Sequence, residues 1–356
     1  LVLGDPKDEY EPLCQALAVE PFTIGPGHPA RINPLDFGPL GYDWTGLGRD
    51  EAHRRAAVIF GRWLTLLRGL VGSQKLGDQR VPYGPTDEVV LKAALTHLTG
   101  WTTGSSQLTE PTIPQLWQTL DQPTHALVAE CRYASVRDML DQTRLLRDAL
   151  GKLVTGTLAG LFDSHTTIHV DWQAPIQSLS LSRLEPLGDE AVGTALVCLN
   201  SWGRAMRETA TPGDLRIVVR DECWKQLRLG PDAIKSFDAD LRLSRRDGDI
   251  QWAVGHKPGD LLSAGDAGSQ AVAIAKDLLH LADIKILHGQ DPAVTDELDN
   301  LLGLSAPARH AITDWAMQGK GRALWCVGDQ HYKVQTILHP AEQQLADTNL
   351  ALTGAA

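Results

Sequence analysis

Short apolar stretches bounded by glycine and proline open this chain of 356 residues, and helical periodicities follow them. Leu1–Leu3 and Pro21–Ile24 have the pattern of short strands, and Glu9–Ala18 lies between them as a short helix. Further along, apolar residues recur every three to four positions between Phe60 and Val71, which predicts a helix with one buried stripe. The chain therefore begins as an α/β fold and then becomes helical.

Further helical patterns follow, and together they predict an almost purely helical block over residues 45–160. The predicted helices are Thr86–Leu98, with Thr86 as its N-cap, Ile113–Leu120, Ser135–Leu150 and Lys152–Leu161. We expect this block to be an all-α insertion into an α/β domain that comprises residues 1–44 and 161–356.

Strand patterns return after the helical block and alternate with helices. Strands are predicted at Thr166–Asp171, Ile176–Leu181, Leu215–Val219, Ile250–Val254, Ile284–Leu287, Gly321–Val327 and Tyr332–Leu338. Helices are predicted at Asp189–Glu208, Gly230–Leu243 and around Ala271–Leu278. Strands that alternate with helices imply a mainly parallel sheet covered by helices on both faces.

Composition adds the broad class of the protein and its compartment. Apolar residues make up 43% and charged residues 22%, the balance of a soluble globular protein. The longest apolar runs, such as Ala195–Leu199, are too short to span a bilayer. The five cysteines are odd in number and never spaced as Cys-x-x-Cys, which favours reduced thiols in a cytoplasmic protein. The net charge of −11 argues against a surface that binds nucleic acid generally, although a local basic strip remains open.

The sharpest chemical signal is the strand Leu215–Val219, which runs through Arg220 into the acidic pair Asp221 and Glu222. Ligands of open α/β sheets bind at the carboxyl ends of the strands, where this pair is expected. Asp221 can hold Mg²⁺ directly or through water, and Glu222 can polarise the water that attacks the γ-phosphate of ATP. Many strands end in an acidic pair for solubility alone, so the pair by itself leaves both interpretations open.

The order of the surrounding segments favours the catalytic interpretation. In that order they resemble the VirB-four-like (TraC-type) ATPases of type IV secretion and conjugation, which belong to the FtsK/HerA-like group of hexameric motors. The resemblance covers nearly the whole chain and rests on Asp5-Pro6-Lys7-Asp8-Glu9-Tyr10, Arg31-Ile32-Asn33-Pro34-Leu35-Asp36, Gly156–Asp163, Asp221-Glu222-Cys223-Trp224, Trp252–Leu261 and Gly319–Trp325.

The resemblance implies a RecA-like P-loop ATPase core, with ATP and Mg²⁺ as cofactors and a homo-oligomeric ring of six. It places Asp5, Glu9 and Tyr10 beside the nucleotide. The segment Trp252–Leu261 resembles the family's sensor strand, which usually ends in Gln, and this sequence has His256 instead. A histidine there can still donate a hydrogen bond to the γ-phosphate, and the alternative is a surface histidine.

Arginines offer a further, less specific signal. Arg245 is a candidate arginine finger that reaches the active site of a neighbouring subunit, and a solvated basic turn explains it equally well. The solvated interpretation is slightly better for Arg246, and Arg322 is another candidate interface residue.

A phosphate-binding loop of the form Gly-x-x-x-x-Gly-Lys-Ser/Thr does not occur in the sequence. Gly151-Lys152 and Gly319-Lys320 lack the hydroxyl residue that should follow the lysine. In the family, the loop precedes the strand that Leu1–Leu3 resembles, so we expect it to lie upstream of this sequence. The chain by itself should then bind ATP poorly, because backbone amides and a lysine must grip the phosphates.

Three functions remain as hypotheses. The first is an ATP-hydrolysing motor that acts with type IV secretion channel proteins at the inner face of the plasma membrane and transports DNA or protein. The second is a DNA-translocating coupling protein or helicase-like ATPase. The third is a non-catalytic scaffold with an ATPase fold, in which the missing loop is a real loss.

Overall fold

The computed structural model describes residues 1–346, apart from residues 77–78, 103–104, 106, 157, 170, 172–173, 209–214, 258 and 260–269. The chain divides into two compact units, Leu1–Val254 and Gly255–Ala356. None of the described helices is long and apolar enough to cross a membrane.

A five-stranded parallel sheet forms the base of the first unit, in the order β2-β5-β1-β6-β7. Its strands are β1 (Val2–Asp5), β2 (Phe22–Thr23), β5 (Ser178–Ser180), β6 (Arg216–Arg220) and β7 (Asp249–Ala253). The ends of these strands fall within two residues of the ends of five predicted segments, and the mainly parallel α/β fold is confirmed.

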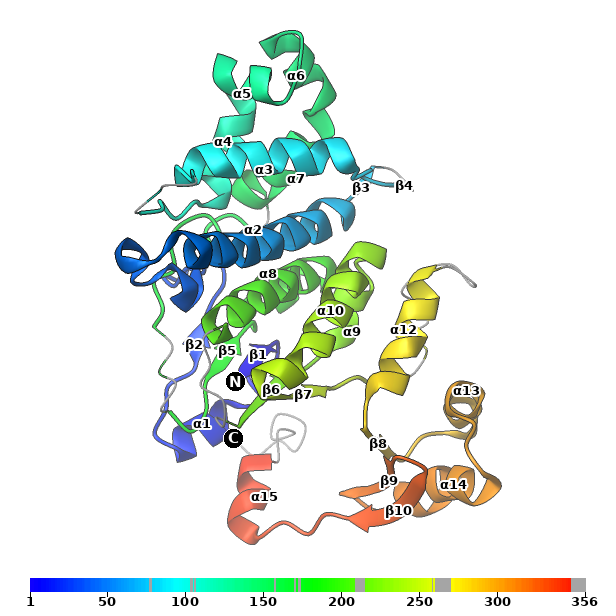
Figure 1. Cartoon of the computed structure of the whole chain (residues 1–356). Helices are drawn as coiled ribbons and strands as arrows, with labels where there is room; N and C mark the ends of the chain where they lie inside the picture. The colour runs from blue at the N-terminus through cyan, green and yellow to red at the C-terminus, as the bar shows by residue number, and fades with distance from the viewer. Residues whose placement is uncertain are drawn as a thin grey trace. The chain divides into compact units, whose positions relative to one another are not determined.

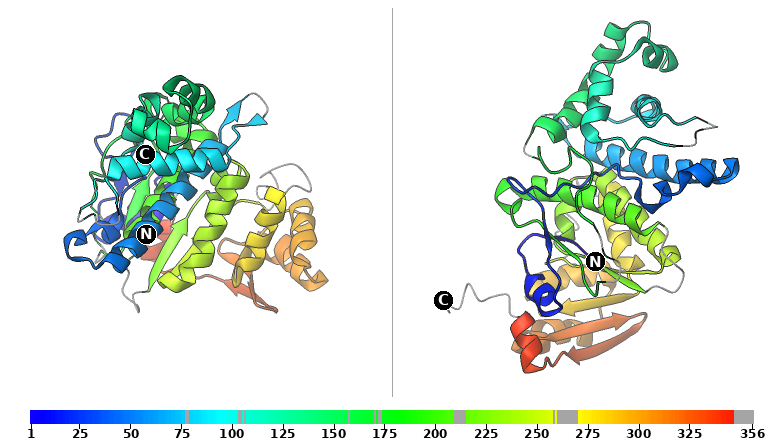
Figure 2. Two further views of the ribbon diagram at one scale, coloured as in Figure 1. Left: turned by 45° about the horizontal axis from the view of Figure 1, so that its top comes forward. Right: turned by 90° about the vertical axis from the view of Figure 1, so that its left-hand side faces the viewer.

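Three long helices form two layers on one face of this sheet. Helices α8 (Asp189–Arg207) and α10 (Pro231–Asp247) pack against β1 and β7, and α2 (Arg49–Gly72) packs on both helices. Figures 1 and 2 show α2 on the side of α8 and α10 that faces away from the sheet. The apolar stripe predicted for α2 is buried, with Trp63 and Leu67 fully inaccessible, because it faces this second layer.

The other helices of the predicted insertion, to which α2 also belongs, stack beyond α2 (Figure 1). They are α3 (Pro85–Thr99), α4 (Ile113–Asp121), α5 (His125–Glu130), α6 (Val136–Gln142) and α7 (Arg144–Thr155), preceded by the short hairpin β3 (Lys75–Leu76) and β4 (Gln79–Arg80). Short elements complete the unit: α1 (Glu11–Ala16), α9 (Cys223–Leu227) and the 3₁₀ turns Gly38–Gly41, Trp44–Gly46 and Glu185–Leu187.

Several predicted boundaries in this region are wrong for local reasons. Thr86 is not the N-cap of α3, because Pro85 already occupies the first helical position, which suits its missing N–H, and Gly84 precedes it. The single helix predicted over Ser135–Leu150 is divided at Thr143 into α6 and α7. A separate helix over Lys152–Leu161 is absent from the described residues, since α7 ends at Thr155 before Gly156.

The strand predicted at Thr166–Asp171 is also wrong over the residues that the structure describes there, 166–169 and 171. Thr167 instead exchanges hydrogen bonds with Arg31, through its own backbone N–H and through its hydroxyl, which accepts from the Arg31 N–H at 2.9 Å. The alternating polar pattern therefore reflects a loop that is paired to another loop.

The second unit contains an antiparallel sheet in the order β10-β9-β8. Its elements are α12 (Gln270–Leu281), β8 (Ile284–His288), α13 (Pro292–Leu302), α14 (Ala306–His310), β9 (Arg322–Val327), β10 (Gln330–Gln335) and α15 (Pro340–Ala346). Leu298, Ile312 and Leu324 belong to its own small core. The hairpin that the sequence predicts is the pair β9 and β10.

Candidate nucleotide site

The carboxyl ends of the parallel strands bring several predicted site residues together. Asp5 ends β1 and is in register with Ser180 at the end of β5, while Asp221 and Glu222 directly follow β6 on the other side of β1. Parallel strands end at one edge of a sheet, so residues far apart in sequence meet there. This edge is the candidate site.

Asp5 organises the turn that leaves β1. Its carboxylate is buried and accepts hydrogen bonds from the backbone amides of Lys7 (3.3 Å), Glu9 (3.0 Å) and Tyr10 (2.9 Å). Asp8 in the same turn has a φ of 57° and accepts a hydrogen bond from the Ser180 hydroxyl. Asp5 thus fixes the loop that places its neighbours at the site.

Tyr10 reaches across to the acidic pair. Its hydroxyl donates to Asp221 Oδ2 at 3.3 Å, and Asp221 Oδ1 accepts from the Glu222 amide at 2.8 Å. Burial, and then the charge of Asp221, raise the pKa of the Tyr10 hydroxyl, so Tyr10 remains a hydrogen-bond donor at neutral pH. Asp221 is thereby held at the tip of β6.

Glu222 occupies a tight, left-handed turn. Its φ is 50°, a conformation that a non-glycine residue adopts at a cost, and its side chain is almost wholly buried. One carboxylate oxygen, Oε1, lies 3.2 Å from Lys7 Nζ, and the other accepts from Trp224 Nε1. The next residue, Cys223, donates through its amide at 3.3 Å to the oxygen of Val254, which ties the turn to the end of β7.

The charges at this edge are predominantly negative. Burial, followed by the charge of Asp221, raises the pKa of Glu9, and burial raises the pKa of Asp5 against its three amide donors. Grouped carboxylates with raised pKa values repel one another, and a cation relieves that repulsion. Hard carboxylate oxygens are the ligands that Mg²⁺ prefers, usually with waters and phosphate oxygens completing its shell, so Asp221 fits such a role.

Other predicted residues are not brought into this cluster by the described contacts. His256 belongs to the second unit, where its backbone oxygen accepts from Gln290 Nε2 at 3.4 Å. Arg322, also in the second unit, donates to the Trp315 oxygen at 3.2 Å and to Gln335. The side chains of Arg245 and Arg246, in α10, lie outside the described residues.

Sequence reasoning did not single out Lys7, Ser180 or Trp224 as site residues. Lys7 and Trp224 both lie inside segments on which the family resemblance rests, and both bind Glu222. No spacing rule marks such partners, since the contact of Lys7 with Glu222 spans 215 residues of sequence.

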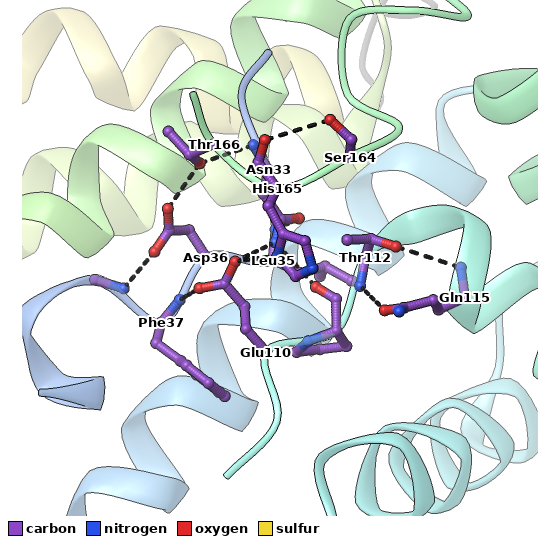
Figure 3. Close-up of polar contacts among 12 residues, drawn as sticks. Asn33, Leu35, Asp36, Phe37, Glu110, Thr112, Gln115, Ser164, His165 and Thr166 are labelled. Atoms are coloured by element: carbon purple, nitrogen blue, oxygen red, sulfur yellow. Dashed lines mark hydrogen bonds and ion pairs between the residues drawn. The ribbon is translucent and has the colours of Figure 1, made fainter. Parts of the chain in front are cut away.

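A second polar cluster shows what the Arg31–Asp36 segment does (Figure 3). Asn33 is fully buried and donates to Glu110 Oε1 and to the Pro111 oxygen, both at 2.9 Å. On the opposite side, the backbone N–H of Asn33 donates to the Thr166 hydroxyl, which in turn donates to Asp36 at 2.7 Å. The segment joins the loop after β2 to the loop before α4, away from the acidic pair.

The Gly156–Asp163 passage meets the same segment. Ile32 donates its amide to the Leu161 oxygen at 3.1 Å, and Arg31 Nε lies 3.7 Å from Asp163 Oδ1. The family resemblance rests on these two segments separately. In the structure they pack together as one joint at the base of the helical block.

The first unit has a parallel sheet flanked by helices, with an acidic pair directly after an apolar strand, and this arrangement matches the RecA-like P-loop ATPase fold. The particular proteins with this fold that resemble the chain come from comparison of structures, since no family model matches it and no curated protein is significantly similar in sequence.

Solved structures of VirB4 and TrwB share the fold. VirB4 of Thermoanaerobacter pseudethanolicus is 19% identical with a TM-score of 0.69, and the match covers 96% of this chain and 83% of that chain. The bacterial conjugative coupling protein TrwBΔN70 is 13% identical with a TM-score of 0.53, covering 95% of this chain and 84% of that one. The plasmid coupling protein TrwB in complex with ADP and Mg²⁺ is 12% identical with a TM-score of 0.47, covering 97% and 79%. The chain thus has the fold of VirB4.

Proposed function

We propose that this chain is the motor part of a Mg²⁺-dependent ATPase that powers type IV secretion or conjugative transfer. The observation that carries the proposal is the pair Asp221 and Glu222 at the tip of β6, braced by Tyr10 and Lys7 from the end of β1. The likeness in fold to VirB4 supports the same function.

Each residue of the pair has a distinct role in this proposal. Asp221 holds Mg²⁺, which supplies neutralisation of the phosphate charges, and Tyr10 keeps the carboxylate in place. Glu222 accepts a hydrogen bond from the attacking water and orients it toward the γ-phosphate. Asp5 and Glu9 shape the wall of the nucleotide pocket, and Asp5 does so by accepting hydrogen bonds from three backbone amides of its turn.

Further parts of the machine are proposed from the family resemblance. His256 senses the γ-phosphate, and Arg245 reaches the site of a neighbouring subunit in a homohexamer. The 356 residues lack the pattern Gly-x-x-x-x-Gly-Lys-Ser/Thr, so by themselves they bind ATP poorly. The hexamer acts at the inner face of the plasma membrane with channel proteins.

The test is ATP turnover by the intact protein, including any residues that precede Leu1. Glu222→Gln keeps the size of the side chain and removes the charge, so turnover should fall about 10²- to 10⁴-fold, the usual contribution of a positioned general base. Glu190→Gln is the matched control, since Glu190 lies at the start of α8 and pairs on the surface with Lys152. Unchanged turnover in Glu222→Gln would contradict the proposal and favour a non-catalytic scaffold.

A DNA-translocating coupling protein is the second candidate, favoured by the likeness to TrwBΔN70. It predicts ATP turnover that rises with added DNA and falls steeply with salt, because phosphate contacts release counterions. The net charge of −11 favours the first candidate.

A further inference from the structure

Both carboxylate oxygens of Glu222 have protein partners. Oε1 accepts from the Lys7 ammonium at 3.2 Å, and Oε2 accepts from the Trp224 indole. Glu222 therefore stands in a defined orientation that its own left-handed turn and two donors maintain. A water that Glu222 polarises must share a carboxylate oxygen with one of these donors or take its place.

The two donors differ in how firmly they are held. Trp224 lies beneath the Arg228 guanidinium, 4.2 Å from its ring centre, and near Lys225, and both cations are paired with Asp189 at the start of α8. Lys7, in contrast, is on the turn after β1, and its side chain is 44% exposed against 6% for Glu222. The lysine is thus the partner that can leave.

We propose that Lys7 is a positioning residue that restrains Glu222 in a resting orientation, and that it releases the glutamate when the terminal phosphate of a bound nucleoside triphosphate offers its ammonium another anion. This inference rests on the proposed function, because it assigns Glu222 to water activation. It makes hydrolysis depend on nucleotide occupancy at the carboxyl edge of the sheet.

Electrostatics support an exchange of this kind. A carboxylate that is paired with an ammonium accepts a hydrogen bond from water less strongly, and a phosphate carries more negative charge than one carboxylate. The hydrogen bond to Glu222 raises the pKa of Lys7, with Glu9 and Glu185 adding to the effect, so the restraint stays charged across the neutral range.

The test compares Lys7→Met with Lys7→Arg in the intact protein, by steady-state ATP turnover. Removing the ammonium should raise kcat about 5-fold, which corresponds to about 1 kcal/mol for a partly exposed ion pair. KM for ATP should rise at the same time, because the phosphate loses a partner. Lys7→Arg should keep both values near those of the unchanged protein, and so should Lys152→Met, whose lysine pairs with Glu190 on the surface.

The remaining outcomes separate this inference from the proposed function. If Glu222→Gln is inactive while folded Lys7→Met has an unchanged or lower kcat, the restraint is overturned and the ATPase assignment stands. If Glu222→Gln retains turnover, both are overturned. Inactivity of Lys7→Met combined with Glu222→Gln, together with the rise in Lys7→Met alone, would support both. Thermal unfolding of each variant shows whether it folds.

Discussion

At the scale of single residues, the carboxylates of this chain differ in the groups that donate hydrogen bonds to them. Asp5 binds three backbone amides, whereas Glu222 binds an ammonium and an indole. A carboxylate bound by amides of its own turn is committed to local structure, and one bound by a partly exposed side-chain cation can change partner. Asp5 and Glu222, which the sequence placed in one site, therefore serve different purposes there.

Asp36 allows the electrostatics of the joint in Figure 3 to be tested. Burial, followed by the nearby charge of Glu110, raises the pKa of Asp36, while hydrogen bonds from Gly38 and Thr166 oppose the shift. A carboxyl with a folded-state pKa above its unfolded-state pKa binds its proton more tightly in the folded protein. Its charged form therefore costs stability at neutral pH, and acidification through the folded-state pKa removes that cost.

The variant Asp36→Asn cannot titrate at this position, so the two proteins should differ in their dependence on pH. The free energy of unfolding of the unchanged protein, relative to Asp36→Asn, should increase as the pH falls from 7 towards 4. Urea unfolding of both proteins at several pH values measures it. A difference that is independent of pH, or that shrinks on acidification, would contradict the raised pKa.

At the scale of elements, α8 supports the acidic pair through the short helix α9. Gly193 in α8 lies against the backbone of α9, and a Cβ added there would be 2.7 Å from the Lys225 oxygen. A backbone oxygen cannot move aside as a side chain does, so the contact requires glycine. Because α9 begins directly after Glu222, the spacing of these two helices sets the position of the glutamate turn.

Gly193→Ala should therefore destabilise the protein by about 1–3 kcal/mol, the usual cost of overpacking. Gly61→Ala is the control, since nothing lies within 4 Å of an added Cβ on that exposed position of α2. It should stabilise the protein by about 0.5–1 kcal/mol, because alanine loses less conformational freedom in a helix. Chemical unfolding measures the free energy of unfolding of both variants, and equal effects of the two substitutions would contradict the packing argument.

At the scale of the whole molecule, each unit has its own core. The large cluster that contains Trp63 and Trp202 lies wholly within the first unit, and the cluster around Ile312 lies within the second. In the first unit, β7 ends the sheet, and Ile217, Ile250 and Trp252 share one face, where 40–53% of each residue is exposed. A core that is complete within one unit permits that unit to fold by itself.

A fragment of residues 1–254 should accordingly unfold in one cooperative transition in urea, followed by circular dichroism and tryptophan fluorescence. The end at Val254 is chosen because its amide donates to the Arg220 oxygen at 3.0 Å and its oxygen accepts from Cys223. A gradual loss of signal, or transitions that differ between the two probes, would show that the first unit depends on the rest of the chain.

The sequence by itself determined the class of fold and much of the candidate site. Periodicity located α2, α8 and the parallel strands, because each buries one apolar face whose spacing is local. It also placed Asp221 and Glu222 at a strand tip, while the family resemblance placed Tyr10 beside the nucleotide, and the roles of these residues stay predictions. The pattern Gly-x-x-x-x-Gly-Lys-Ser/Thr does not occur among the 356 residues.

Only the tertiary structure decided which polar side chains bind one another. The contacts of Glu222 with Lys7, of Asn33 with Glu110 and of Arg31 with Thr167 all join segments far apart in sequence. Such contacts depend on the order of the strands and on the paths of the loops, and neither produces a periodic pattern in the sequence. Local spacing records which face of an element is buried, whereas the identity of its polar partners is a property of the packed whole.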